Sequence, residues 1–121
     1  MRADLLAADT TLQQRNAEME DLRGRIDQEV RSALLDLTSA SELVRVAQSN
    51  RELARETLSE AQDRFTAGVT DNIEVVQAQE SVSAADQAYI SSLYSFNIAK
   101  VQLARSVGVA EQAVKAYLGG K

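Results

Sequence analysis

The sequence predicts an all-α fold in which two helices form a long, antiparallel, coiled-coil-like hairpin. Its 121 residues contain no proline and 19 alanines, and aromatic residues make up only 4% of the chain. This composition favours helices, because strands are enriched in β-branched and aromatic residues. In addition, small or apolar residues recur every seven positions over most of the chain. A sustained repeat of this kind keeps one face of each helix against a partner helix.

The first helix is expected to cover residues 3–67. Gly24 weakens it by about 1 kcal/mol relative to alanine, which a long helix tolerates. A companion series of large residues at the same spacing is interrupted at Arg51. The seven-residue series itself runs through Leu5, Leu12, Met19, Ile26, Ala33, Ala40, Ala47, Ala54, Ala61 and Gly68.

A tight turn is expected at residues 68–71. Gly68 suits the left-handed conformation that often ends a helix. Asp71 and Glu74 have the spacing of an N-terminal capping box, with Asp in place of Ser or Thr. Both carboxylates also suit the start of a helix because of its dipole. The turn therefore separates the long helix from a second, returning helix.

The return helix is expected over residues 72–107, followed by a short helix at 110–118 and a tail at 119–121, with Gly108 as the break. Folding at Gly68 places the small residues of the two long helices opposite each other, which permits close approach of their backbones. The expected helix-packing seam consists of the pairs Ala61/Ala78, Ala54/Ala85, Ala47/Ser92, Ala40/Ala99 and Ala33/Ser106.

Many apolar residues are left without a partner in such a hairpin. Leu43, Ile90 and Tyr94, for example, lie away from the seam. A small three- or four-helix bundle would explain them, and so would the wall of a larger bundle or tube, where each helix has neighbours on two sides.

The first helix is also longer, at about 95 Å against about 52 Å for the second. The residues expected to lack an intrachain partner for this reason are Leu5, Leu12, Met19, Leu22 and Ile26. Burying each contributes about 1.5–3 kcal/mol, so another subunit or further sequence should cover them.

Several function classes are disfavoured by composition. The chain has no Cys and no His, which excludes thiolate nucleophiles, imidazole bases and zinc fingers. Its net charge of −5 argues against nucleic-acid binding, which needs Lys and Arg on the phosphate backbone. No apolar stretch approaches the roughly 20 residues of a membrane-spanning helix. The first residues lack a basic start followed by an apolar run, so no targeting signal is expected in this chain. We also expect no catalytic, cofactor-binding or metal-binding residues.

The residues around the turn carry a family resemblance. Residues 61–79 read AQDRFTAGVTDNIEVVQAQ, in which an aromatic residue precedes a glycine and an acidic-apolar-apolar-x-Ala-Gln run follows. This segment resembles the periplasmic tip of TolC-type outer-membrane efflux proteins. Ala88-Tyr89 and the run from Ala99 to Gly108 are similar to the return helix of that family, and Ile26 to Ala33 to the middle of its long helix. The resemblance covers nearly the whole chain and corresponds to the C-terminal half repeat of the family.

The resemblance implies a place in a larger assembly. Three protomers of such proteins form a β-barrel in the outer membrane that continues as an α-helical barrel across the periplasm. This chain would supply a helical hairpin of that barrel and touch the membrane only through the β-barrel, whose strands it lacks. The tip would dock a periplasmic adaptor and an inner-membrane pump. Carried over by position, the docking residues would be Arg64, Phe65, Gly68, Val69, Thr70, Asp71, Asn72 and Glu74.

In this role the chain would be part of a passive conduit for the efflux or export of small molecules or proteins. Two other functions are alternatives. A structural or adaptor hairpin, as in periplasmic membrane-fusion proteins, also uses Ala-rich antiparallel helices. The unequal helix lengths and the second apolar stripe count against it. An enzyme would need carboxylates, Lys, Ser and Tyr that converge, whereas the carboxylates here are spread along helical faces. The resemblance therefore implies the channel segment, with the parent protein localised to the outer membrane and periplasm of a Gram-negative type of cell.

Overall fold

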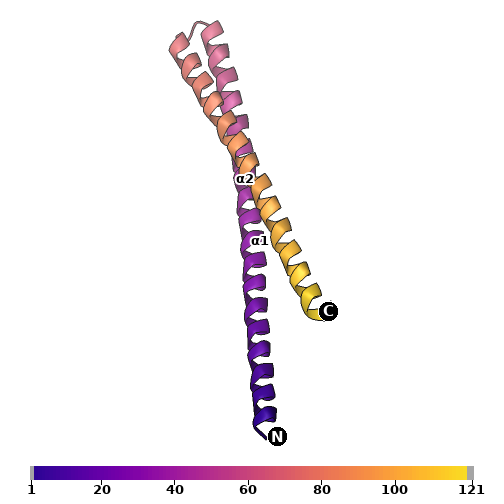
Figure 1. The fold of residues 1–121 in the computed structure, drawn as a ribbon. Coiled ribbons are helices and arrows are strands. Elements are labelled where there is room, and N and C mark those ends of the chain that lie inside the picture. The colour runs from indigo at the N-terminus through magenta and orange to yellow at the C-terminus, as the bar shows by residue number, and fades with distance from the viewer. Residues whose placement is uncertain (1, 120–121) are drawn as a thin grey trace. The chain divides into compact units, whose positions relative to one another are not determined.

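A computed structural model of the protein, which describes residues 2–119, confirms the all-α hairpin. Helix α1 spans Arg2–Thr66 and helix α2 spans Asn72–Gly119. The two are joined by a turn at residues 67–71, where the magenta and orange ends of the ribbon meet in Figure 1. Within residues 2–119 there is no strand. Residues 120–121 of the expected tail lie outside the described part of the chain.

The expected break at Gly108 is wrong. Helix α2 runs through this residue without interruption and has 48 residues, so the separate helix at 110–118 does not exist. One interior glycine costs a helix only about 1 kcal/mol. Beyond it, Ala110 and Ala113 are half-buried and continue the three- and four-residue spacing of the inward-facing positions. Burial along this continued face favours the helix over a local break.

The chain divides into two compact units, which are described separately. The tip unit comprises residues 36–101, and the terminal unit comprises residues 2–35 together with residues 102–119. Each unit pairs a segment of α1 with a segment of α2. The heptad repeat of the sequence runs through both units.

In the tip unit, small side chains lie between the two helices. Ala61 is only 1% exposed, and Ala40, Ala78 and Ala99 are also buried. The other inward-facing small residues of this unit are half-buried: Ala47, Ala54, Ala85 and Ser92. Alanine at these positions leaves little room between the backbones, so adding one methylene group there would destabilise the packing.

In the terminal unit, the last expected pair of the seam departs from close packing at Ser106. Ala33 of α1 is buried, at 7% exposed, but Ser106 of α2 is only half-buried. The sequence analysis treated Ser106 as equivalent to the alanines of the series, because its side chain is almost as small. The same half-burial occurs at Ala47, Ala54 and Ala85, so it does not depend on the hydroxyl. Ser106 is therefore one of several seam positions that are packed less closely than the buried alanines.

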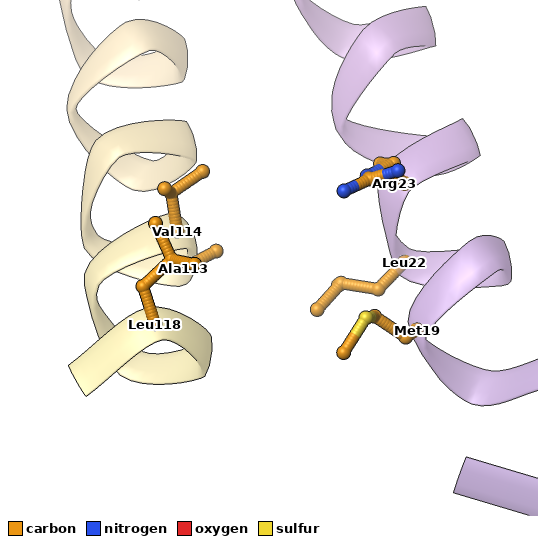
Figure 2. Close-up of a pocket in the computed structure, with 6 residues that line it drawn as sticks. All are labelled: Met19, Leu22, Arg23, Ala113, Val114 and Leu118. Carbon is orange, nitrogen blue, oxygen red and sulfur yellow. The ribbon is translucent and has the colours of Figure 1, made fainter. Parts of the chain in front are cut away.

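In the terminal unit, fewer residues lack an intrachain partner than the sequence predicted. Leu22 and Ile26 are half-buried, because the continuous α2 reaches them. Met19, Leu22 and Arg23 line one side of a small pocket, and Ala113, Val114 and Leu118 line the other. Figure 2 shows Met19 and Leu22 pointing from α1 toward this α2 segment. The prediction was wrong for Leu22 and Ile26, since it rested on the shorter return helix.

The start of α1 does lack partners within the described chain. Leu5, Leu6 and Leu12 are 70%, 66% and 59% exposed, and every residue from Arg2 to Glu20 is exposed. Apolar leucines at such exposure are a feature of surfaces that other chains cover. Over residues 2–119, neither helix has a stretch that is both long and apolar enough to cross a membrane.

Candidate functional site

The turn at the tip is closed by main-chain hydrogen bonds. The amide of Val69 donates to the carbonyl of Arg64 at 3.0 Å, and the amide of Gly68 donates to that of Phe65 at 3.0 Å. Gly68 has a φ of +75°, in the left-handed region. This combination is the Schellman motif, in which a left-handed glycine lets the last carbonyls of a helix find donors. Gly68 therefore ends α1 as the sequence suggested.

Three polar side chains connect the two helices next to this turn. Arg64 Nη1 lies 3.1 Å from Glu74 Oε1, and the Thr70 hydroxyl donates to Glu74 Oε2 at 2.6 Å. Arg64 and Glu74 are 52% and 36% exposed. The sequence suggested that Glu74 caps its own helix; instead, the Glu74 carboxylate contacts Arg64 of α1 and Thr70 of the turn.

Apolar side chains at the tip point into solvent. Val69 is 75% exposed and Phe65 is 49% exposed. Ile73, in the first turn of α2, is 59% exposed and was not among the expected docking residues. Asp71 and Asn72 are exposed at the start of α2. The eight expected tip residues thus lie together at one end of the tip unit, with Ile73 beside them.

A second polar cluster lies inside the seam, where the sequence showed only an interruption. Arg51 Nε donates to Asp86 Oδ1 at 2.8 Å, and the Arg51 guanidinium lies over the Tyr89 ring, 4.9 Å from its centroid. Arg55 Nη2 lies 3.6 Å from the same Asp86 oxygen. Sequence reasoning missed this cluster because Asp86 becomes its partner only in one register of the two helices.

The two sides of the tip unit carry different surfaces. On one side, Leu43 and Val46 of α1 and the small residues Ala88, Ser91 and Ser95 of α2 line a shallow groove. Because successive helical residues are rotated by about 100°, Ile90 and Leu93 lie on the opposite side of α2 from Ser91 and Ser95. Ile90 is 65% exposed, and Tyr94 and Val101 continue this stripe at 69% and 67%, on the face of α2 that points away from the seam. The tip unit therefore has apolar residues on one flank and on the outer face of α2.

The charged groups of the described chain do not gather into a metal site. Over residues 2–119, no group of three or more acidic residues is placed to hold a metal ion. Most other ion pairs lie within one helix, such as Arg45 with Glu42 at 3.0 Å. A hydrogen bond to Asp21 raises the pKa of Arg25 above its ordinary value, on the exposed face of α1. These are surface interactions that support a helix.

Comparison with known proteins identifies the family. No curated protein and no solved structure matches the chain. The family model described as "Outer membrane efflux protein" matches residues 1–109, which include the whole tip unit and most of the terminal unit. This family consists of transport components and differs from the adaptor class that the helical pattern alone left open. The chain therefore belongs to the outer membrane efflux protein family, whose members are components of outer-membrane efflux channels.

Proposed function

We propose that this hairpin forms part of the wall of a trimeric, periplasmic α-helical tube and that its tip docks an inner-membrane adaptor and pump. The family match over residues 1–109 is the observation that carries the proposal. In this role the chain does no chemistry. It shapes a conduit, and its partners supply the energy for transport.

The apolar residues outside the seam support a place in a tube wall. An isolated hairpin needs one apolar seam, whereas a helix with further neighbours needs further apolar stripes. Leu43 and Val46 provide such a stripe on one flank, and Ile90 and Tyr94 provide another on the outer face of α2. The exposed Leu5 and Leu12 at the start of α1 add to the surface that neighbouring segments would cover.

The exposed tip supports docking at the turn. Phe65, Val69 and Ile73 present apolar surface, while Arg64, Thr70 and Glu74 are engaged with one another. Because the polar cluster holds the two helix ends together, the apolar side chains are displayed on a fixed support. Exposed apolar residues that gather in one place are a feature of interaction surfaces.

Docking is tested by adding a charge at the tip. Val69→Asp should reduce efflux of a fluorescent dye from cells and reduce cross-linking to the adaptor, with the amount of assembled channel unchanged. Ser59→Asp is the matched control, because it adds the same charge to an exposed position of α1 away from the turn. Normal efflux and adaptor cross-linking in Val69→Asp would refute docking through this surface.

The tube wall is tested by adding a charge to each of these apolar surfaces. Leu43→Lys and Tyr94→Lys should each lower the fraction of trimer seen by native mass spectrometry of the purified channel. Ser49→Lys is the control for Leu43→Lys, since Ser49 is exposed on the same helix and lies on the side of α1 away from the seam. An unchanged trimer fraction in both Leu43→Lys and Tyr94→Lys would exclude these two apolar surfaces from the wall.

A further inference from the structure

Within the tip unit, a cluster of charged side chains bridges the two helices away from the turn. Arg51 and Asp86 are only 31% and 37% exposed, and their 2.8 Å hydrogen bond spans the two helices. Arg51 occupies a position where the companion series otherwise has Val44 and Leu58. A polar residue at one such position of a coiled coil is known to specify register at a cost in stability.

The rest of the seam does not specify one register. Its small residues repeat every seven positions on both helices, so sliding one helix by a heptad again places small against small. For example, Ala47 faces Ser92 in the observed register and would face Ala85 or Ala99 in the two neighbouring ones. The large residues repeat in the same way, with Val82 or Phe96 replacing Tyr89. Packing of the seam alone therefore leaves these registers close in energy, and the turn at Gly68, which a slip would have to rebuild, is the other element that favours the observed one.

The charged cluster breaks this equivalence. After a slide of one heptad, Arg51 would lie against Val82 or Phe96, and Asp86 would lie against Val44 or Leu58. Each charge would then be partly buried against apolar side chains without its partner. Leaving a charge in this way is more costly than the pair itself is stabilising. The penalty falls on the wrong registers.

We propose that Arg51, Asp86 and Tyr89 form a register key that selects one alignment of α1 and α2 among those that the heptad repeat permits. Arg55 reinforces the key from the next turn of α1, 3.6 Å from Asp86. The key adds little to the stability of the observed hairpin. Its main effect is to raise the free energy of slipped hairpins.

The test uses cysteine pairs in the full chain, which has no cysteine of its own. Ala47→Cys with Ser92→Cys reports the observed register, because both residues line the same groove. Ala47→Cys with Ala85→Cys, or with Ala99→Cys, reports a slip of one heptad. Such a slip is about 10.5 Å along a helix, which is beyond the reach of a disulfide. In the parent background, the two slipped pairs should therefore oxidise at least about tenfold more slowly than the observed pair.

The key is then removed with Arg51→Leu, which restores an apolar residue to the series. The slipped pairs should now oxidise at least about threefold faster than in the parent background, while helix content stays the same and the thermal midpoint falls slightly, because Asp86 keeps only the more distant Arg55 as a partner. The charge swap Arg51→Asp with Asp86→Arg should restore the preference for the observed pair. Arg45→Leu is the matched control, since Arg45 pairs with Glu42 on its own helix. Slipped pairs that stay slow in Arg51→Leu would overturn the proposal and assign the register to the turn alone.

Discussion

Arg64 and Glu74 form an ion pair of 3.1 Å that joins the last turn of α1 to the first turn of α2. Thr70 adds a hydrogen bond to the same carboxylate from within the turn. The tip is therefore closed twice, once by the main chain and once by side chains. These two closures differ in how they respond to mutation and to salt.

Replacing Glu74 by Gln should lower the free energy of unfolding by about 0.5 kcal/mol, because a half-exposed ion pair contributes little in water. The loss should disappear at about 1 M NaCl, where the screening length falls to about 3 Å. Urea denaturation at low and high salt measures both values. Equal losses at the two salt concentrations would show that the ion pair is not the stabilising element.

Glycine-to-alanine substitutions should have opposite signs at different positions. Gly68→Ala should destabilise the chain by about 1–2 kcal/mol, since its φ of +75° is unfavourable for any residue with a Cβ. Gly24→Ala and Gly108→Ala should instead stabilise it by up to about 1 kcal/mol, because both glycines lie inside helices. A Cβ at either position meets nothing within 4 Å. Thermal midpoints of the three variants test the prediction, and the same sign for all three would contradict it.

The alanine seam should not accept larger side chains. Ala61 is 1% exposed, so Ala61→Leu should cost about 1–3 kcal/mol through overpacking. Ala84→Leu is the control, because Ala84 is exposed on α2 and its change should stay within about 0.5 kcal/mol. Chemical denaturation gives both values. A cost for Ala84→Leu as large as that for Ala61→Leu would mean that the seam is placed wrongly.

Because α2 is continuous, Leu22 should contribute more than Leu5 to the free energy of unfolding. Leu22 is half-buried beside Ala113, and Leu22→Ala should cost about 2 kcal/mol, at the low end for buried leucines. Leu5 is 70% exposed, and Leu5→Ala should change stability by less than about 0.5 kcal/mol in the isolated chain. The unfolding free energies of the two variants test this prediction. Equal losses would contradict the packing of α2 against Leu22 and favour the shorter return helix that the sequence suggested.

The comparison of sequence and structure separates two kinds of information. The hairpin was predictable because its signal is repeated: the same spacing at Ala33, Ala40 and Ala61 recurs on the return helix. The left-handed turn was predictable because Gly68 is the residue that its geometry favours. Both conclusions draw on local or periodic features.

Other structural features were missed because they depend on a balance between local cost and burial, or on a partner residue in the other helix. Gly108 looked like a break because its local cost is visible in the sequence, whereas burial of Ala110 and Ala113 is visible only in the fold. Arg51 looked like a defect because its partner, Asp86, is 35 residues away in the chain. The ion pair between Arg64 and Glu74 was missed because it also joins the two helices, whereas Glu74 could be explained as a cap of its own helix.

The periodic signal also does not report how tightly each position is packed. Ser106 fits the spacing of the small residues as well as Ala99 does, yet Ala99 is buried and Ser106 is only half-buried. Spacing assigns a residue to a face of the helix, whereas its exposure depends on how closely the other helix approaches at that point.

The hydrogen bonds that close the turn come from backbone amides, so the side chain of Val69 has little part in holding the hairpin together. Substitutions at this position should therefore have small effects on folding, whereas Gly68 is held by its conformation. Under the docking role proposed above, the loop would serve as an interchangeable recognition element on a constant scaffold.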